Sequence, residues 1–457
     1  MDTVRINEKD NVLVELSSGH KVAAENISEG TDIIKYGFPI GRATCDIKEG
    51  ERVHSHNMKT KLAGLLSYEY TPKFTFPEKE EPFEIMAFER GNGEIGIRND
   101  IWIVPTVGCV NSAAKALADK TGAIAFSHPY GCSQLGGDME TTQLILKGLI
   151  THPNAGGVLV LGLGCENNHI GEMKKVLGSV NEKRIRFLNA QDCEDEISEG
   201  IRIIGELKEI AEKDERTPVP VSRLKVGLKC GGSDGFSGIT ANPTVGRVTD
   251  RLCAMGASAV LTEVPEMFGA ETVLFERCIS EELFTKAVSL INDFKEYFRS
   301  HGEPVSENPS PGNKEGGITT LEEKSLGCVQ KGGSAPVVDI LTYGDKITKP
   351  GLSLLNGPGN DIVSVTNLSA AGCHMVLFTT GRGTPLGGAV PTVKIATNDN
   401  LAKKKKGWID FTASSFDTKE SAEKLLKLIK EIADGKETKN ELNSSREIAI
   451  FKDGVTL

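Results

Sequence analysis

The chain has 457 residues, a formal net charge of −10 and ten cysteines. It is too long for a single hydrophobic core, so we expect about two or three domains. The acidic balance argues against a nucleic-acid or anionic-membrane surface, and we find neither a secretory signal nor an apolar run long enough to span a bilayer. Cysteines without short regular spacing indicate reduced thiols or metal ligands, so we expect a cytoplasmic protein.

Residues 1–70 have the pattern of a small all-β domain, because short alternating apolar runs are separated by glycine turn signals. The domain includes the motif VHSHN over residues 53–57. If this motif is a strand, His54 and His56 project from one face and could contact one metal ion or one anionic substrate. The alternative is two exposed histidines without a role. Residues 71–84 carry prolines and a cluster of charges, and we interpret them as a linker.

From about residue 85 onward, strand-like and helix-like segments alternate. The first predicted strands are Ile101–Val104, Ala123–Phe126, Val158–Leu163 and Arg184–Leu188. The first predicted helices are Ser112–Lys120, Met139–Ile150, Gly171–Leu177 and Asp195–Glu212. This alternation is typical of parallel sheets with helical crossovers. We therefore predict two Rossmann-like parallel α/β domains, one over 85–220 and a C-terminal catalytic one over 221–457. No phosphate-binding glycine motif follows the first strand of either, so nucleotide binding is not supported.

The stretch 226–250 is the most informative part of the C-terminal domain. Its strand pattern ends at Cys230, where two glycines permit a tight turn, and a helix is predicted to begin near Pro243. The intervening loop carries Asp234 together with serine hydroxyls. Because ligands in open α/β sheets bind at the carboxyl ends of the strands, we expect this loop to belong to a binding site.

Two further predicted strands also end in a loop with a cysteine beside glycine, namely Cys132 and Cys165. If these thiols converge with Cys230, they suit iron(II) or an iron–sulfur cluster. Each could instead be a buried thiol that packs as a small hydrophobic side chain. Cys109, near Asn111 at another strand-to-helix junction, either packs in the same way or joins the site.

Two later segments add candidates. Arg382 lies between glycines after a predicted strand, where its guanidinium could bind a substrate carboxylate or form a surface ion pair. Residues 320–323 (TLEE) predict a capping box for a helix that carries Lys324. The preceding glycine- and proline-rich loop over 302–318 is of a length that is usually functional or disordered.

Several longer motifs resemble those of the altronate/galactarate dehydratase family. They are GCVN (108–111), HPYGCSQ (128–134), LGLGCE (161–166), CGGSDGFSGITANPTVG (230–246), EVPEMFGAE (263–271), NPSPGNKEGGITTLEEKSLG (308–327), KGG (331–333) and FTTGRGTP (378–385). The N-terminal domain with its VHSHN motif resembles the β-clip (SAF-type) domain of that family. The sequence departs from the family pattern at Cys373 and His374, to which we assign no role.

The resemblance implies dehydration of an aldonate or aldarate to a 2-keto-3-deoxy acid, with iron as Fe²⁺ or a cluster. Proton removal beside a carboxylate needs a base, a cation that holds the enediolate, and an acid that helps hydroxide leave. The metal ligands are then expected to be Cys132, Cys165 and Cys230. The catalytic candidates are His128, favoured as the base, Glu166, Asp234 and Glu263. The substrate-binding candidates are His54, His56, Asn111, Lys324 and Arg382.

Two alternatives remain open from the sequence. One is a sibling lyase that resembles sulfolactate sulfo-lyase, and the other is a non-catalytic protein that binds iron or a sugar acid. The expected partner of the dehydratase is a small-molecule sugar acid. We expect neither nucleic acid nor a membrane as a partner. The sequence does not determine the oligomeric state, for which a homodimer is one candidate.

Overall fold

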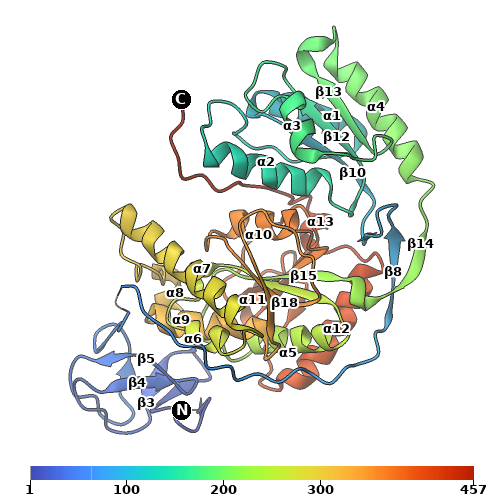
Figure 1. Ribbon diagram of the computed structural model, residues 1–457. Coiled ribbons are helices and arrows are strands. Elements are labelled where there is room, and N and C mark those ends of the chain that lie inside the picture. The colour runs from blue at the N-terminus through green and yellow to red at the C-terminus, as the bar shows by residue number, and fades with distance from the viewer. Residues whose placement is uncertain (1, 63) are drawn as a thin grey trace.

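The computed structural model describes residues 2–62 and 64–457. A small strand-rich part at the N-terminus is joined by a long extended segment to two α/β parts, which confirms the expected fold class (Figure 1). Within these residues, none of the helices combines the length and the apolar character that crossing a bilayer requires.

The N-terminal domain consists of two small antiparallel sheets with strand orders β1-β2-β3-β6 and β4-β5-β7. The strands are β1 (Thr3–Val4), β2 (Val12–Glu15), β3 (Lys21–Ala23), β4 (Asp32–Lys35), β5 (Phe38–Ala43), β6 (Arg52–Val53) and β7 (Met58–Lys59). Apolar residues from both sheets, such as Val12, Ile33 and Ile40, are buried in one hydrophobic cluster. Strands this short need a second sheet or a partner domain to cover their apolar face.

Residues 64–83, which precede β8 (Glu84–Glu89), run in an extended conformation along the C-terminal domain (Figure 1). The amide of Lys73 donates to the carbonyl of Glu276 at 2.7 Å, and the amide of Glu80 donates to that of Ala254 at 3.1 Å. The segment is therefore fastened along its length. β8 then pairs with β9 (Ile95–Gly96) and β14 (Arg216–Pro220) in a three-stranded antiparallel sheet.

The second domain is a four-stranded parallel sheet with the order β11-β10-β12-β13. The strands are β10 (Asp100–Pro105), β11 (Ile124–Ala125), β12 (Ala155–Gly162) and β13 (Ile185–Asn189). The helices are α1 (Asn111–Thr121), α2 (Gly137–Ile150), α3 (Ile170–Leu177) and α4 (Glu196–Ala211). α1 packs on α4 through Leu117, Ile203 and Leu207, whereas α2 packs on α10 (Asp361–Ala370) of the C-terminal domain.

The C-terminal domain is a seven-stranded parallel sheet with the order β17-β18-β16-β15-β19-β20-β21. The strands are β15 (Lys225–Cys230), β16 (Ser258–Leu261), β17 (Val337–Leu341), β18 (Gly351–Leu355), β19 (Met375–Thr380), β20 (Thr392–Ala396) and β21 (Phe411–Thr412). The remaining helices are α5 (Ala241–Ala254), α6 (Glu271–Phe275), α7 (Glu281–Ser300), α8 (Pro311–Glu315), α9 (Leu321–Cys328), α11 (Asp399–Lys404), α12 (Thr418–Ala433) and α13 (Lys439–Leu442).

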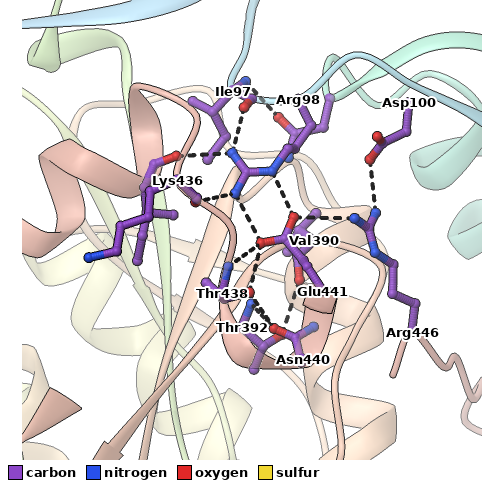
Figure 2. Close-up of polar contacts among 12 residues, drawn as sticks. Ile97, Arg98, Asp100, Val390, Thr392, Lys436, Thr438, Asn440, Glu441 and Arg446 are labelled. Atoms are coloured by element: carbon purple, nitrogen blue, oxygen red, sulfur yellow. Dashed lines mark hydrogen bonds and ion pairs between the residues drawn. The ribbon is translucent and has the colours of Figure 1, made fainter. Parts of the chain in front are cut away.

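A buried ion pair joins the second domain to the C-terminal domain (Figure 2). Arg98 donates to both carboxylate oxygens of Glu441 on α13, at 2.7 and 2.9 Å, and also to the carbonyls of Ile432 and Lys436. Arg446 adds a link between Glu441 and Asp100 at the start of β10. Bidentate pairing with additional carbonyl acceptors satisfies a buried guanidinium, so this contact fixes where β10 enters its sheet.

A second buried charge cluster docks the N-terminal domain on α9. Glu323 accepts from Lys21 at 2.8 Å and from Lys35 at 2.9 Å, and all three side chains are at most 1% exposed. Glu323 also accepts from the amide of Thr319, so its carboxylate does not close the capping box expected over residues 320–323, although Thr320 caps α9. Burial alone would raise the pKa of Glu323, but the two lysines outweigh it and lower the pKa to about 2.

We predict that Glu323→Gln weakens the docking of the N-terminal domain, because it leaves two buried lysines without a counter-charge. Breaking a buried ion pair costs about 3–5 kcal/mol. Limited proteolysis between residues 64 and 83 should accelerate, and the free energy of unfolding should fall.

Asp32→Asn is the matched control, since Asp32 pairs with Lys61 and Arg42 on the half-exposed surface of the same domain. Such surface pairs contribute little. Equal proteolysis rates for the two variants would contradict the assignment of Glu323 as the docking residue.

Candidate active site

Charged and sulfur-bearing side chains gather where β15 and β16 end at the carboxyl edge of the seven-stranded sheet. β15 contributes Lys229 and Cys230, and the turn after β16 contributes Glu263 and Glu266. α9 and the short helix that follows it cover them with Lys324, Cys328 and Lys331. Every one of these side chains is buried. We call these seven residues the carboxyl-edge cluster.

Glu263 holds the strand end and one lysine together. Its carboxylate accepts from the ammonium of Lys229 and from the amide of Cys230 at 3.0 Å, and Lys331 lies 3.5 Å away. Glu263 has a φ of 73°, which is unusual for a side chain other than glycine. Such strained residues are found preferentially at functional sites.

Glu266 is the centre of the sulfur-bearing half of the cluster. Its Oε2 lies 3.2 Å from the Sγ of Cys230 and 3.0 Å from that of Cys328, and the two sulfurs are 3.3 Å apart. Its Oε1 accepts from Lys324 at 2.8 Å. These three donor atoms lie within 4.8 Å of one another, so Cys230, Glu266 and Cys328 form a group that could hold a metal ion. Two sulfurs and one carboxylate oxygen suit iron(II) or zinc.

The lysines set the charge balance of this cluster. Burial alone would raise the pKa of Glu266, but Lys324 and then Lys229 outweigh it and hold the pKa well below its usual range. Burial raises the pKa of Glu263, although Lys229 acts against it. The contact with Cys230 and burial together raise the pKa of the Cys328 thiol. The cluster thus contains one glutamate that stays ionised and one that takes up a proton more readily.

A small cavity of about 10 Å³ lies beside the cluster. Its lining includes Tyr36 of the N-terminal domain, Ser233 and Asp234 of the loop after β15, and Lys324 and Cys328 of α9. Ser233 is buried, and its hydroxyl has no hydrogen-bond partner in the structure. This volume is about that of one water molecule, so the site is closed to any larger ligand in this conformation.

Tyr36 reaches the cavity because glycines make room for it. A Cβ atom at Gly238 would lie 2.4 Å from the Tyr36 hydroxyl, and one at Gly327 would lie 3.6 Å from it. Tyr36 itself lies in the turn between β4 and β5 and has a φ of 62°. The N-terminal domain therefore contributes a tyrosine to the site.

Asp234 lies at the same sheet edge, but its carboxylate is occupied. It accepts from the amides of Phe236 and Ser237 and from the side chains of Thr397 and Asn398. Burial raises its pKa. Asp234 therefore joins the loops that follow β15 and β20, and its carboxylate is engaged by these hydrogen bonds although the residue also lines the cavity.

The two histidines of the VHSHN motif lie in a turn after β6, so the prediction that they project from one strand face is wrong. The side chain of Asn57 accepts from the amide of His54 and closes this turn. The Nε2 of His54 lies 3.0 Å from the carbonyl of Lys314, whereas His56 is exposed.

Arg382 is also exposed, and its guanidinium pairs with the carboxylate of Glu315 on α8 at 2.9 Å. This is the surface ion pair that was the alternative to binding a substrate carboxylate.

Three residues expected to be catalytic or substrate-binding lie in the second domain and bind its own loops. His128 is buried, with its Nε2 2.8 Å from the carbonyl of Pro105 and its Nδ1 accepting from the amide of Tyr130, and burial lowers its pKa. Glu166 accepts from Thr106 at 2.6 Å and from two amides of its own turn. Asn111 donates to the carbonyl of His128. With both ring nitrogens engaged, His128 is not arranged as a base.

The structure does not bring the three expected metal-binding cysteines together. Cys230 is buried against Cys328 and Glu266 in the C-terminal domain. Cys132 and Cys165 are exposed on loops of the second domain. The two sheets are separate, so one iron centre shared by all three is not supported.

Sequence reasoning missed Glu266 and Cys328 as donors and Lys229, Lys331 and Tyr36 as neighbours of the site. One signal could have indicated Lys229, because a parallel strand that is covered on both faces is usually continuously apolar. A lysine in such a strand needs a buried counter-charge. Nothing local to α9 indicates that Cys328 meets Cys230, since the two are far apart along the chain.

Comparison with known protein families agrees with the three parts of the fold. Residues 14–61 match the altronate/galactarate dehydratase SAF domain. Residues 87–212 match the second domain of D-galactarate dehydratase/altronate hydrolase. Residues 221–456 match the C-terminal domain of D-galactarate/altronate dehydratase.

Individual relatives align over most of the chain. Altronate dehydratase of Bacillus subtilis is 53% identical, covering 99% of this chain and 94% of its own length. Altronate dehydratase of Escherichia coli is 51% identical, covering 97% of this chain and 93% of its own length. The beta subunit of (2R)-sulfolactate sulfo-lyase of Chromohalobacter salexigens is 31% identical, covering 80% of this chain and 97% of its own length. The chain belongs to the altronate/galactarate dehydratase family and is a lyase of the dehydratase type.

Proposed function

We propose that this lyase removes water from an altronate-type sugar acid to give the 2-keto-3-deoxy acid, at the carboxyl-edge cluster. The observation that carries the proposal is the cluster itself, in which three buried lysines surround Glu263, Glu266 and two thiols. The similarity to two altronate dehydratases over nearly the whole chain supports the choice of substrate class.

The chemistry needs positive charge where the enediolate forms, and the lysines supply it. Removing the proton next to a carboxylate creates a second negative charge, which is stabilised best by fixed cations in a water-poor site. Lys229 and Lys331 approach Glu263, and Lys324 approaches Glu266. Glu263, whose pKa is raised by burial, is our candidate for the group that accepts and returns a proton.

We further propose that Cys230, Glu266 and Cys328 hold iron(II). The donor set fits a divalent ion, because two thiols and a carboxylate converge and three ammonium groups surround them. When bound, the ion would supply Lewis acidity toward the substrate carboxylate and hydroxyl groups. The lysines would favour the deprotonated thiols that such a site needs.

Substrate entry requires a movement, because the cavity beside the cluster holds only about 10 Å³. The covering elements are α9 and the N-terminal domain, which are linked through Glu323. The neighbouring residue Lys324 pairs with Glu266, so a displacement of α9 would open the cluster and the docking contact together. We propose that the N-terminal domain closes over the bound acid in this way.

We predict that altronate yields a 2-keto acid when the full-length chain is loaded with iron(II) and assayed without oxygen. Galactarate, its epimers and sulfolactate are assayed in parallel. Release of sulfite from sulfolactate without a 2-keto acid from any sugar acid would move the assignment to the sulfo-lyase. Iron and sugar-acid binding without turnover of any of them would identify a binding protein instead.

We predict that Cys328→Ala loses iron(II) that is loaded in the absence of sulfide. Losing a residue that only hydrogen-bonds to a metal ligand lowers the affinity for the metal by about 10- to 100-fold. Loss of a direct ligand should lower the metal affinity at least as much. Iron per chain is measured by elemental analysis after gel filtration.

Cys278→Ala is the control, because Cys278 is also buried in the same domain and its thiol donates to the carbonyl of Leu274. Both changes leave a similar small cavity. Iron retained in Cys328→Ala at the level of Cys278→Ala would remove Cys328 from the metal site.

We predict that Tyr36→Phe slows turnover and leaves folding intact, because the ring still packs while the hydroxyl that faces the cavity is lost. A hydrogen bond to a charged group contributes about 1.5–3 kcal/mol, which corresponds to a decrease in kcat of roughly 10- to 100-fold. Tyr70→Phe is the control, since Tyr70 lies on the extended segment and its hydroxyl donates to the carbonyl of Cys278 in the C-terminal domain. Similar kcat values for the two variants would exclude Tyr36 from the site.

A further inference from the structure

Three cysteines of the second domain follow three neighbouring strands of one parallel sheet. Cys109 follows β10, Cys132 follows β11 and Cys165 follows β12, and β10 lies between the other two strands. All three thiols are free and exposed. Free cysteine is among the most buried residue types, so three exposed ones at a single sheet edge are unusual.

The loops that carry the three cysteines are fastened to one another by hydrogen bonds. The amide of Gly108 donates to the carbonyl of Tyr130, and the amide of Asn168 donates to that of Gly131, each at 2.9 Å. The amide of Ser133 donates to the side chain of Asn167 at 2.9 Å. Each cysteine therefore lies within a few residues of a direct link to a neighbouring cysteine loop.

The polar residues of these loops serve the same purpose. Glu166 accepts from Thr106 and so ties the loop of Cys165 to the loop of Cys109. Asn111 and His128 tie the loop of Cys109 to the loop of Cys132. Their buried hydrogen bonds hold the loop backbones in place while the thiols remain accessible, which is the arrangement of a preorganised ligand site.

The backbone beside two of the thiols has positive φ values, which are easy for glycine and uncommon for serine. Gly131 and Gly164 have φ values of 99° and 129°, and Ser133 has a φ of 58°. A Cβ atom at Gly131 would lie 2.0 Å from the carbonyl oxygen of Thr106, so the loops approach as closely as glycine allows. Hydrogen bonds also reach the sulfurs, from Gln191 to Cys165 at 3.5 Å and from Ser133 to Cys132 at 3.9 Å.

We propose that Cys109, Cys132 and Cys165 together bind a four-iron iron–sulfur cluster at this edge of the second domain. The site is distinct from the group formed by Cys230, Glu266 and Cys328, and the inference goes beyond the proposed function. Three soft ligands on rigid loops match iron–sulfur ligation, and hydrogen bonds to the sulfurs are typical of such sites. Each thiol releases its proton to solvent and, as a thiolate, replaces one exchangeable ligand such as water on an iron of an assembled cluster, and no electrons are transferred in this exchange.

Three cysteines leave one of the four irons without a cysteine ligand, since such a cluster is usually held by four. Because all three cysteines are exposed, that iron would be accessible to solvent and could accept an oxygen ligand such as water or a carboxylate. A single metal ion is less well suited, because among residues 2–62 and 64–457 the donor atoms that meet within 4.8 Å are those of Cys230, Glu266 and Cys328.

The test uses the full-length protein, reduced and reconstituted without oxygen by iron and sulfide. Iron and acid-labile sulfide per chain are measured after desalting, together with the visible absorption and the electron paramagnetic resonance of the reduced sample. We expect labile sulfide and a cluster signal in the unchanged protein, and their loss in each of Cys109→Ala, Cys132→Ala and Cys165→Ala. The thermal unfolding midpoint should change little, because the thiols are exposed.

Cys193→Ala and Cys230→Ala are the controls. Cys193 follows the next strand of the same sheet and its thiol donates to the carbonyls of Asn189 and Ala190, whereas Cys230 belongs to the C-terminal domain. Both should keep their labile sulfide. Iron without labile sulfide, or sulfide retained in all three loop variants, would overturn the proposal. A cluster that forms while no substrate is turned over would count against the proposed function alone.

Discussion

The charges buried at the carboxyl edge of the seven-stranded sheet must be matched by opposite charges, and the rest of the structure is arranged around that constraint. Lys229, Lys324 and Lys331 lie in a water-poor environment, where an unpaired ammonium would cost several kcal/mol. Glu263 and Glu266 balance most of this charge at short distances. Because these groups come from β15, from the turn after β16 and from α9, the network holds the covering helix on the sheet.

The same principle extends to the N-terminal domain. Glu323 on α9 is neutralised by Lys21 and Lys35, so the small β-domain is attached to the helix that also carries Lys324 and Cys328. Attachment by buried ion pairs is specific in geometry, because each carboxylate oxygen has its own donor. The domain thereby places a tyrosine beside the cluster and covers a site that the C-terminal domain alone would leave more open.

In the second domain, polar residues of the sequence motifs stabilise the loops that carry them. His128 and Glu166 are catalytic candidates in the sequence and Asn111 is a substrate-binding candidate, yet their side chains form hydrogen bonds with neighbouring loops. A buried donor or acceptor must be satisfied, so loops that cross at a sheet edge need such residues. Cys109, Cys132 and Cys165 on those loops are free and exposed, so their thiols remain available to bind a ligand.

Periodicity was sufficient to predict the second domain almost element by element, since α1–α4 and β10–β13 begin and end within a few residues of the expected bounds. Local glycine and proline signals also placed Cys230, Asp234 and Arg382 at strand ends. The partners of those residues could not be predicted, because Cys230 meets Cys328 across most of a domain and the histidines of VHSHN lie in a turn that Asn57 closes. Alternation and turn chemistry are local properties, so the sequence by itself determined the elements, their order and the fold class. Which side chains share a site depends on how separate sheets and helices pack, and only the tertiary structure decided that.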